Sequence, residues 1–123
     1  MVVAAGRVMD KLMRAERAVL ILTRTDCEVC TDFVREVRQL LTNVPCSGVA
    51  VGELVLDRRG AQRFVRANPW MADLRVLPYT LLMRRGQQVE DFATTQAAYV
   101  LSRVRASLFR EAVAHCPAGD IGA

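Results

Sequence analysis

The chain has 123 residues, of which 52% are hydrophobic and 24% are charged, with a formal net charge of +4 at pH 7. This length suits one domain with its own hydrophobic core, and the composition excludes a globally disordered chain. The positive charge comes almost wholly from arginines scattered among acidic residues, so it does not indicate nucleic-acid binding, which needs a clustered basic face.

The N-terminal segment predicts neither a signal peptide nor a membrane helix. Charged residues from Arg7 onward leave no uninterrupted apolar stretch of about 7–15 residues for a signal peptide, nor the roughly 20 of a membrane-spanning helix. We therefore expect a cytoplasmic protein that does not associate with membranes. In that reducing compartment, a close cysteine pair is more often catalytic, redox-sensing or metal-binding than a permanent structural disulfide.

The first elements are a helix and a buried strand. Apolar residues recur at helical spacing among charged residues over 3–17, which predicts an amphipathic helix. The unbroken apolar run Ala18–Leu22 is typical of a strand that is buried on both faces, as in the middle of a parallel sheet. Residues 23–26 are predicted to form a polar loop, in which Asp26 is suited to cap the next helix.

The middle of the chain predicts a helix, a second strand and a short helix. Apolar residues at helical spacing run from Cys30 to about Thr42, and Asn43 and Pro45 end this helix. Residues 49–56 are predicted to form the second strand. A short helix is predicted over 59–67.

The last part predicts a hairpin and a closing helix. After a loop through Trp70 and Met71, strands at 80–83 and 88–92 are joined by a tight turn at 85–87. Apolar residues then recur at helical spacing over 97–108.

This order of elements predicts an α/β fold. A βαβ unit followed by a hairpin and a helix gives a three-layer arrangement, a mixed four-stranded sheet flanked by helices on both faces. We expect a single domain over residues 1–116, with the helix at 3–17 as an N-terminal addition. Residues 117–123 have little to pack against and are expected to form a flexible tail.

Cys27 and Cys30 form a Cys-x-x-Cys pair where the buried strand meets an amphipathic helix. At a helix N-terminus, unpaired backbone N–H groups and the helix dipole favour a thiolate on the first cysteine. The thiolate is the attacking species in disulfide exchange, and a second cysteine one turn into the helix is near enough to resolve a mixed disulfide. We therefore expect Cys27 to attack and Cys30 to resolve.

With this pair the chain resembles the thioredoxin family, over roughly residues 17–109. The sequence Val76-Leu77-Pro78-Tyr79-Thr80 looks like the family's segment in which a cis-proline precedes the hairpin. Gly86 follows that proline at the family's interval, and Asp57 after the second strand fits the same pattern.

The resemblance implies a thioredoxin-like fold and a thiol-disulfide oxidoreductase that exchanges disulfides with a protein substrate. Pro78 would be cis and lie against the cysteine pair, and Leu77 would offer backbone groups to an extended substrate chain, a form of strand addition. The resemblance implies no bound cofactor or metal, and the electrons would come from a reductase or a small thiol.

Several features depart from the family's pattern. Asp26 stands where the family has a tryptophan, Glu28-Val29 where it has Gly-Pro, and Ile21 where it has a buried acid. Ala93 stands where the family has a glycine after the last strand, and a predicted helix takes the place of the family's opening strand. Without the acid, proton transfer from Cys30 would rely on water or Glu28. The negative charges of Asp26 and Glu28 disfavour a thiolate on Cys27, whereas the helix N-terminus favours it. We therefore expect a specialised relative rather than a general-purpose thioredoxin.

Two other functions stay open from the sequence. A protein-binding or assembly module with little redox activity would keep the fold without needing the missing catalytic features. A zinc site would combine Cys27 and Cys30 with Cys46 and Cys116, which requires the C-terminal tail to fold back to the sheet. We favour single buried or tail thiols at Cys46 and Cys116, and we place His115 near the end of the last helix rather than on a metal.

Overall fold

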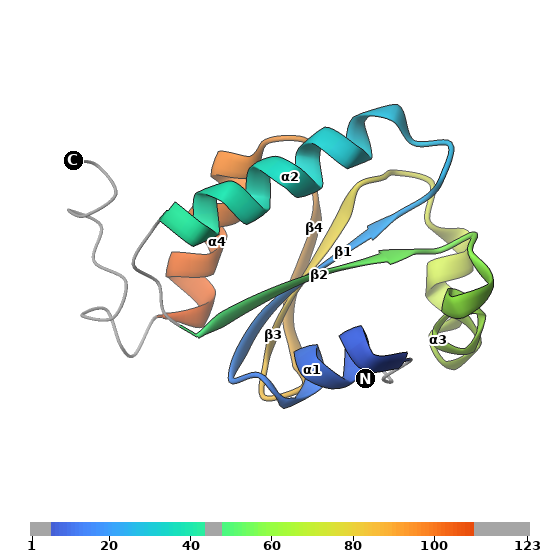
Figure 1. Ribbon diagram of the computed structural model, residues 1–123, viewed down its shortest axis with the longest axis horizontal. Coiled ribbons are helices and arrows are strands. Elements are labelled where there is room, and N and C mark those ends of the chain that lie inside the picture. Colours follow the sequence, from blue (N-terminus) through green and yellow to red (C-terminus); the bar gives the residue numbers. More distant parts are fainter. Residues whose placement is uncertain (1–5, 44–47, 110–123) are drawn as a thin grey trace.

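A four-stranded mixed sheet forms the middle of the computed structural model, which describes residues 6–43 and 48–109 (Figure 1). The strands are β1 (Arg17–Thr23), β2 (Val49–Val55), β3 (Tyr79–Arg84) and β4 (Gln87–Ala93). They lie side by side in the order β2-β1-β3-β4. β1 pairs in parallel with β2 and antiparallel with β3, and β3 and β4 form an antiparallel hairpin. The predicted mixed sheet is confirmed.

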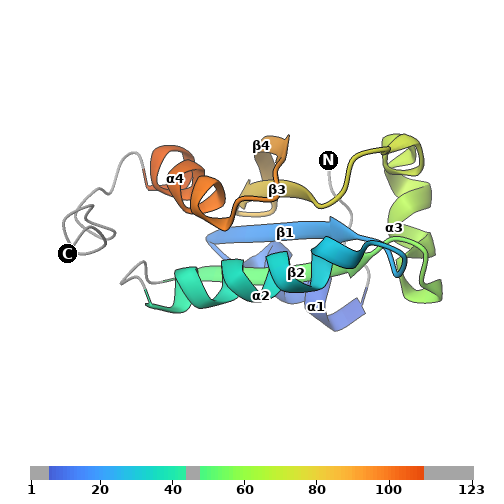
Figure 2. The same ribbon diagram turned by 90° about the horizontal axis from the view of Figure 1, so that it is seen from above.

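Helices cover both faces of this sheet. The α-helices are α1 (Gly6–Arg14), α2 (Glu28–Asn43), α3 (Gln62–Ala67) and α4 (Ala97–Leu108), and two short 3-10 helices are η1 (Arg59–Ala61) and η2 (Pro69–Asp73). α2 and α4 pack against one face, and α1 and α3 against the other (Figure 1). Seen from above, α2 runs along β2 while α4 lies on the side of β3 (Figure 2). The predicted three-layer arrangement is therefore confirmed.

The central strand β1 explains the unbroken apolar run of the sequence. Every residue from Ala18 to Thr23 is buried, because β1 has a neighbouring strand on each side and helices over both faces. Val19 and Ile21 point into the core beneath α2 and α4. Leu20 and its alternate neighbours point into the core beneath α1 and α3. Each residue of the run thus packs into one of two cores, as expected for a strand at the centre of a sheet.

The turn between β3 and β4 depends on a glycine. Arg85 and Gly86 have φ angles of 53° and 80°, in the left-handed region where glycine is favoured. A side chain at Gly86 would also approach the carbonyl oxygen of Met13 to 3.0 Å. The predicted tight turn is confirmed, and the residue at its tip packs against the chain just before β1.

Some element bounds differ from the predicted ones. The helix predicted over 3–17 ends at Arg14, because strand pairing with both neighbours begins at Arg17. Residues 3–5 lie outside the described part of the chain. Thr23, predicted in a loop, is the last residue of β1, and the predicted loop through Trp70 forms η2. In the described ranges, no helix has both the length and the apolar character needed to cross a membrane.

Candidate functional site

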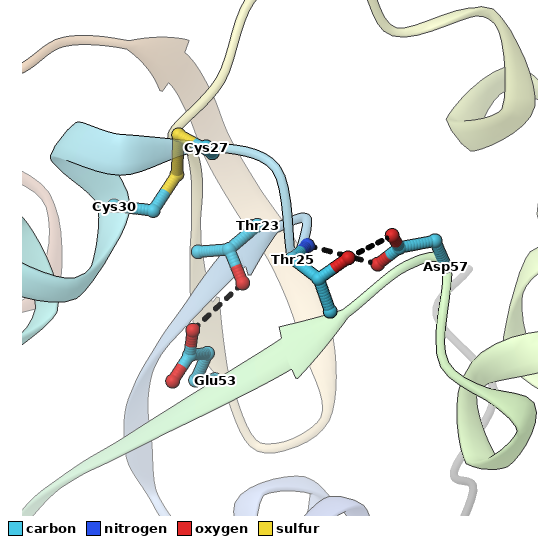
Figure 3. The surroundings of a disulfide bond; sticks show 6 residues. All are labelled: Thr23, Thr25, Cys27, Cys30, Glu53 and Asp57. Atoms are coloured by element: carbon cyan, nitrogen blue, oxygen red, sulfur yellow. Dashed lines mark hydrogen bonds between the residues drawn. A yellow bond between two sulfur atoms is a disulfide. The ribbon is translucent and has the colours of Figure 1, made fainter.

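Cys27 and Cys30 are joined by a disulfide at the start of α2, with their Cα atoms 5.4 Å apart (Figure 3). α2 begins at Glu28, so Cys27 directly precedes the helix and Cys30 lies in its first turn. Cys27 is half-buried, whereas Cys30 is 2% exposed on the inner face of the helix. An approaching molecule therefore meets the sulfur of Cys27 first.

The residues around the cysteines refine the predicted helix start. The Cys30 N–H donates to the Cys27 carbonyl oxygen at 3.3 Å, and the Cys27 N–H donates to that of Arg24 at 3.1 Å. Asp26, predicted as a helix cap, lies one residue further from the helix than Cys27 does. Asp26 and Glu28 are both exposed, so solvent screens their repulsion of a thiolate at Cys27.

Asp57 braces the loop that carries Cys27. Its Oδ1 accepts a hydrogen bond of 3.0 Å from the Thr25 N–H, and its Oδ2 accepts one of 2.5 Å from the Thr25 hydroxyl (Figure 3). These bonds lower the pKa of the Asp57 carboxyl below its ordinary value, and the bond from the Thr25 hydroxyl has the larger effect. The loop between β1 and α2 is thus tied to the chain just beyond the end of β2.

Glu53 and Thr23 were not among the residues predicted for the site. The Thr23 hydroxyl donates to Glu53 Oε2 at 2.7 Å, and Figure 3 shows this pair below the disulfide, between the strand ends and α2. Thr23 is 1% exposed and Glu53 is half-buried. The alternation along 49–56 gives a sequence signal for Glu53. Val49 and Val51 pack against the core beneath α2 and α4, and Glu53 is the next residue on the same face of the strand.

The second predicted segment lies beside Cys27. Leu77 and Cys27 line one pocket of about 570 Å³, together with the charged residues Arg24, Asp26, Asp73 and Arg75. The Leu77–Pro78 peptide bond is cis, as the resemblance implies, and Pro78 is buried. The structure therefore brings Leu77 and Cys27 to one hollow with charges of both signs.

Apolar side chains are exposed next to this pocket. Val29, between the two cysteines, is 51% exposed, and Val76, before Leu77, is 61% exposed. Trp70 packs edge-on against Tyr79, with their ring centroids 6.1 Å apart. The Tyr79 hydroxyl donates a hydrogen bond to the Asp91 carboxylate. Burial, and to a smaller extent this carboxylate, raise the pKa of Tyr79 to about 12. Tyr79 is therefore a neutral phenol at physiological pH.

The possible zinc ligands fall partly outside the described chain. Among the residues that the structure describes, no three His, Cys, Asp or Glu side chains gather in a way that could hold a metal ion. Cys46, His115 and Cys116 lie outside the described residues. The prediction of single thiols at Cys46 and Cys116, and its four-cysteine alternative, therefore stay predictions.

Comparison with protein families and with curated proteins finds no match. Solved structures of similar fold include oxidised mitochondrial thioredoxin 3 of Saccharomyces cerevisiae, with a TM-score of 0.61, 11% identity, and coverage of 79% of this chain and 84% of that chain. The oxidised thioredoxin of Plasmodium falciparum has a TM-score of 0.64 at 8% identity, covering 85% and 93%. A mutant thioredoxin of Halobacterium salinarum has a TM-score of 0.63 at 17% identity, covering 85% and 87%. With these neighbours, its sheet order and its Cys-x-x-Cys disulfide, the chain has the thioredoxin-like fold.

Proposed function

We propose that this domain exchanges disulfides with a protein substrate through Cys27 and Cys30. The observation that carries the proposal is the disulfide at the start of α2, with one half-exposed and one buried cysteine, beside a pocket that Cys27 and Leu77 share. A disulfide that served only to staple the fold would need no such neighbouring pocket. The thioredoxin-like fold supports the same chemistry by analogy.

The proposed reaction starts from the dithiol form. The Cys27 thiolate attacks one sulfur of the substrate disulfide, the substrate S–S bond breaks, and the other substrate sulfur leaves as a thiolate. Cys30 then attacks the sulfur of Cys27, which releases the second substrate sulfur and forms the Cys27–Cys30 disulfide. The domain loses two electrons and the substrate gains them. An external dithiol or small thiol returns the domain to its reduced form.

The proposed roles of Leu77 and Pro78 are to position the substrate. Leu77 would offer its backbone groups to an extended segment of the substrate, while Pro78 shapes the chain beside the disulfide. The pocket that Leu77 shares with Cys27 supports this placement. The exposed Val29 and Val76 would contact apolar side chains of the same segment.

We also propose the setting of this activity. The domain would extend over residues 1–116, with 117–123 as a tail, and would act in the cytoplasm without a bound cofactor. A reductase or a small thiol would supply its electrons. The mixed charges around the pocket, from Arg24, Asp26, Asp73 and Arg75, support a specialised range of substrates.

An insulin-reduction assay tests the proposal. With dithiothreitol as the electron donor, the wild-type protein should accelerate precipitation of the insulin B chain, and Cys27→Ser should return the rate to that of dithiothreitol alone. Cys46→Ser, which leaves the pair intact, is the matched control and should behave as wild type. Equal, negligible rates for wild type and Cys27→Ser would overturn the proposal and favour a binding module.

A further inference from the structure

We propose that Glu53 accepts the proton of Cys30 when Cys30 resolves the mixed disulfide, and that Thr23 holds the Glu53 carboxylate in position. This inference rests on the proposed disulfide exchange. In the thioredoxin family's pattern a buried acid stands where this chain has Ile21, so the sequence left water or Glu28 as the proton acceptor. The inference assigns that role to Glu53 of β2 instead.

The resolving step requires a base near Cys30. A thiol must lose its proton before its sulfur can attack a disulfide efficiently. Cys30 is 2% exposed, so bulk solvent has little access to its sulfur. Glu28, the acid considered from the sequence, is exposed on the outer side of the first turn of α2. A proton acceptor within the fold is therefore the better candidate.

The strand register places Glu53 on the same face of the sheet as Cys30. Ile21 is paired with Glu53 across β1 and β2, and paired residues of neighbouring strands point to the same face. Ile21 lies in the core beneath α2, the helix that buries Cys30 on its inner side. Thr23 is two residues beyond Ile21 and so shares this face. Figure 3 shows Glu53 and Thr23 on the side of the sheet below the disulfide.

The hydrogen bond from Thr23 gives Glu53 a defined position. Thr23 is 1% exposed, and its hydroxyl donates to Oε2 of Glu53 at 2.7 Å. Within residues 6–43 and 48–109, no arginine or lysine forms an ion pair with Glu53. With Oε2 held by Thr23, Oε1 stays available to accept a proton, directly or through one water molecule.

The chain near Glu53 carries one charged contact from α2 and another beyond the end of β2. From α2, the Arg38 side chain approaches the same strand and donates to the Val51 carbonyl oxygen at 3.1 Å. Beyond the end of β2, Asp57 is engaged by Thr25, and the charge of Arg24 acts on Asp57. From β1, the facing residue is the apolar Ile21. Both carboxylate oxygens of Asp57 already accept hydrogen bonds from Thr25. Of the two carboxylates, Glu53 is therefore the better candidate for the proton acceptor.

The proposed step is balanced in atoms and electrons. The Cys30 thiol gives its proton to the Glu53 carboxylate, and the resulting thiolate attacks the sulfur of Cys27. The Cys27–Cys30 bond forms, the bond between Cys27 and the substrate breaks, and the substrate sulfur leaves with the electron pair. Glu53 then returns its proton to solvent. In the reverse direction, protonated Glu53 donates to Cys30 as an external thiol opens the disulfide.

The two steps can be followed separately with an aromatic disulfide, 5,5′-dithiobis(2-nitrobenzoate). Reduced protein carrying Cys46→Ser and Cys116→Ser releases one coloured thiolate when Cys27 attacks and a second when Cys30 resolves. In this background, Glu53→Gln should slow the second release by about 10²-fold, the lower end for general base catalysis, and leave the first unchanged. Glu36→Gln, an exposed change further along α2, is the matched control and should leave both releases unchanged.

The pH profile distinguishes proton transfer from a structural effect. In the background protein, where the proton passes to a side chain within the fold, the rate of the second release should depend little on pH. In Glu53→Gln it should rise with pH through the range in which solvent deprotonates a thiol. Thr23→Val should slow the second release less than Glu53→Gln does. A second release in Glu53→Gln that equals the background rate at every pH would overturn the inference, while failure of the first release in the background protein would overturn the proposed function.

Discussion

Single residues fix the loop that presents Cys27. Asp57 accepts two hydrogen bonds from Thr25, one from its N–H and one from its hydroxyl. Next to this contact, the Leu56 N–H donates to the Thr23 carbonyl oxygen at 2.8 Å. The end of β1 and the end of β2 are thereby held together on either side of the loop. The position of Cys27 thus depends on a side chain thirty residues later in the sequence.

We predict that Asp57→Asn lowers the thermal unfolding midpoint and removes part of its acid dependence. The pKa of Asp57 is held below 3.8 in the folded protein, so its ionised form stabilises the fold above that value. This contribution disappears as the pH falls below 3.8 through the folded pKa. The wild-type midpoint should therefore fall more steeply below about pH 4 than that of Asp57→Asn. Asp10→Asn, an exposed change on α1, is the control and should keep the wild-type slope.

We predict that Tyr79 ionises late in an alkaline titration. Burial and the Asp91 carboxylate raise its pKa from 10.0 to about 12, so the folded state favours the neutral phenol. The stabilisation is complete below pH 10 and is lost as the pH rises toward 12. Ultraviolet absorbance should show a tyrosine that titrates near pH 12, and Tyr79→Phe should abolish that component. A titration curve that Tyr79→Phe leaves unchanged above pH 11 would refute this assignment.

At the scale of elements, β4 and α4 are joined by a polar contact outside the core. The Arg103 side chain donates to both carboxylate oxygens of Glu90, at 2.6 and 2.8 Å, and the Ser107 hydroxyl also bonds to Glu90. The bonds from Arg103 lower the pKa of Glu90. Because β4 is an edge strand with several exposed residues, this contact fixes where α4 lies along it.

We predict that Glu90→Gln lowers the thermal midpoint at pH 7 by about 2–5 °C, a modest effect because the pair is partly exposed to solvent. The difference from wild type should shrink as the pH falls below the ordinary carboxyl range, since wild-type Glu90 is then protonated as well. Glu36→Gln, an exposed change on α2, should leave the midpoint at its wild-type value. A Glu90→Gln protein with the wild-type midpoint at pH 7 would show that this contact adds no stability.

Periodicity located the elements better than it located their ends. The apolar run Ala18–Leu22 predicted β1, because a strand between two neighbours and two cores has no polar face. The apolar pattern of α2 begins only at Cys30, and the helix start beside Cys27 was instead predicted from the possible cap at Asp26 and the Cys-x-x-Cys pair; the helix begins at Glu28. The Cys-x-x-Cys pair could be recognised from its spacing. For Glu53, the alternation along 49–56 indicates its face of the strand, but its place below the disulfide depends on the register of β1 against β2, which no local pattern encodes.

At the scale of the whole molecule, the sheet separates two hydrophobic cores. One lies beneath α2 and α4, and it supports the helix that carries Cys30. The other lies beneath α1 and α3, and it includes Met71 of η2 and the half-buried Leu77 before β3. The helix that begins beside the disulfide packs on the first core, and Leu77 packs against the second. The candidate site therefore lies where both cores reach the same end of the sheet.

We predict that Phe64→Ala destabilises the fold by about 3–5 kcal/mol, the usual cost of removing a buried aromatic side chain. Phe64 of α3 is 0% exposed and lies in the core that supports Leu77. Urea denaturation of the oxidised protein measures the change. Val89→Ala, an exposed change on β4, is the control and should shift the free energy of unfolding by less than about 0.5 kcal/mol. A loss below about 1 kcal/mol for Phe64→Ala would contradict this packing.

The central claim, that Cys27 attacks and Cys30 resolves, is tested most directly by trapping the mixed disulfide. Reduced protein with Cys46→Ser and Cys116→Ser is mixed with a disulfide-bonded peptide, and the product is identified by mass spectrometry of the intact protein and its fragments. Adding Cys30→Ser should give a stable adduct of the peptide on Cys27, whereas adding Cys27→Ser should give none. An adduct on Cys30 that forms as fast as the one on Cys27, or no adduct with either variant, would contradict the account.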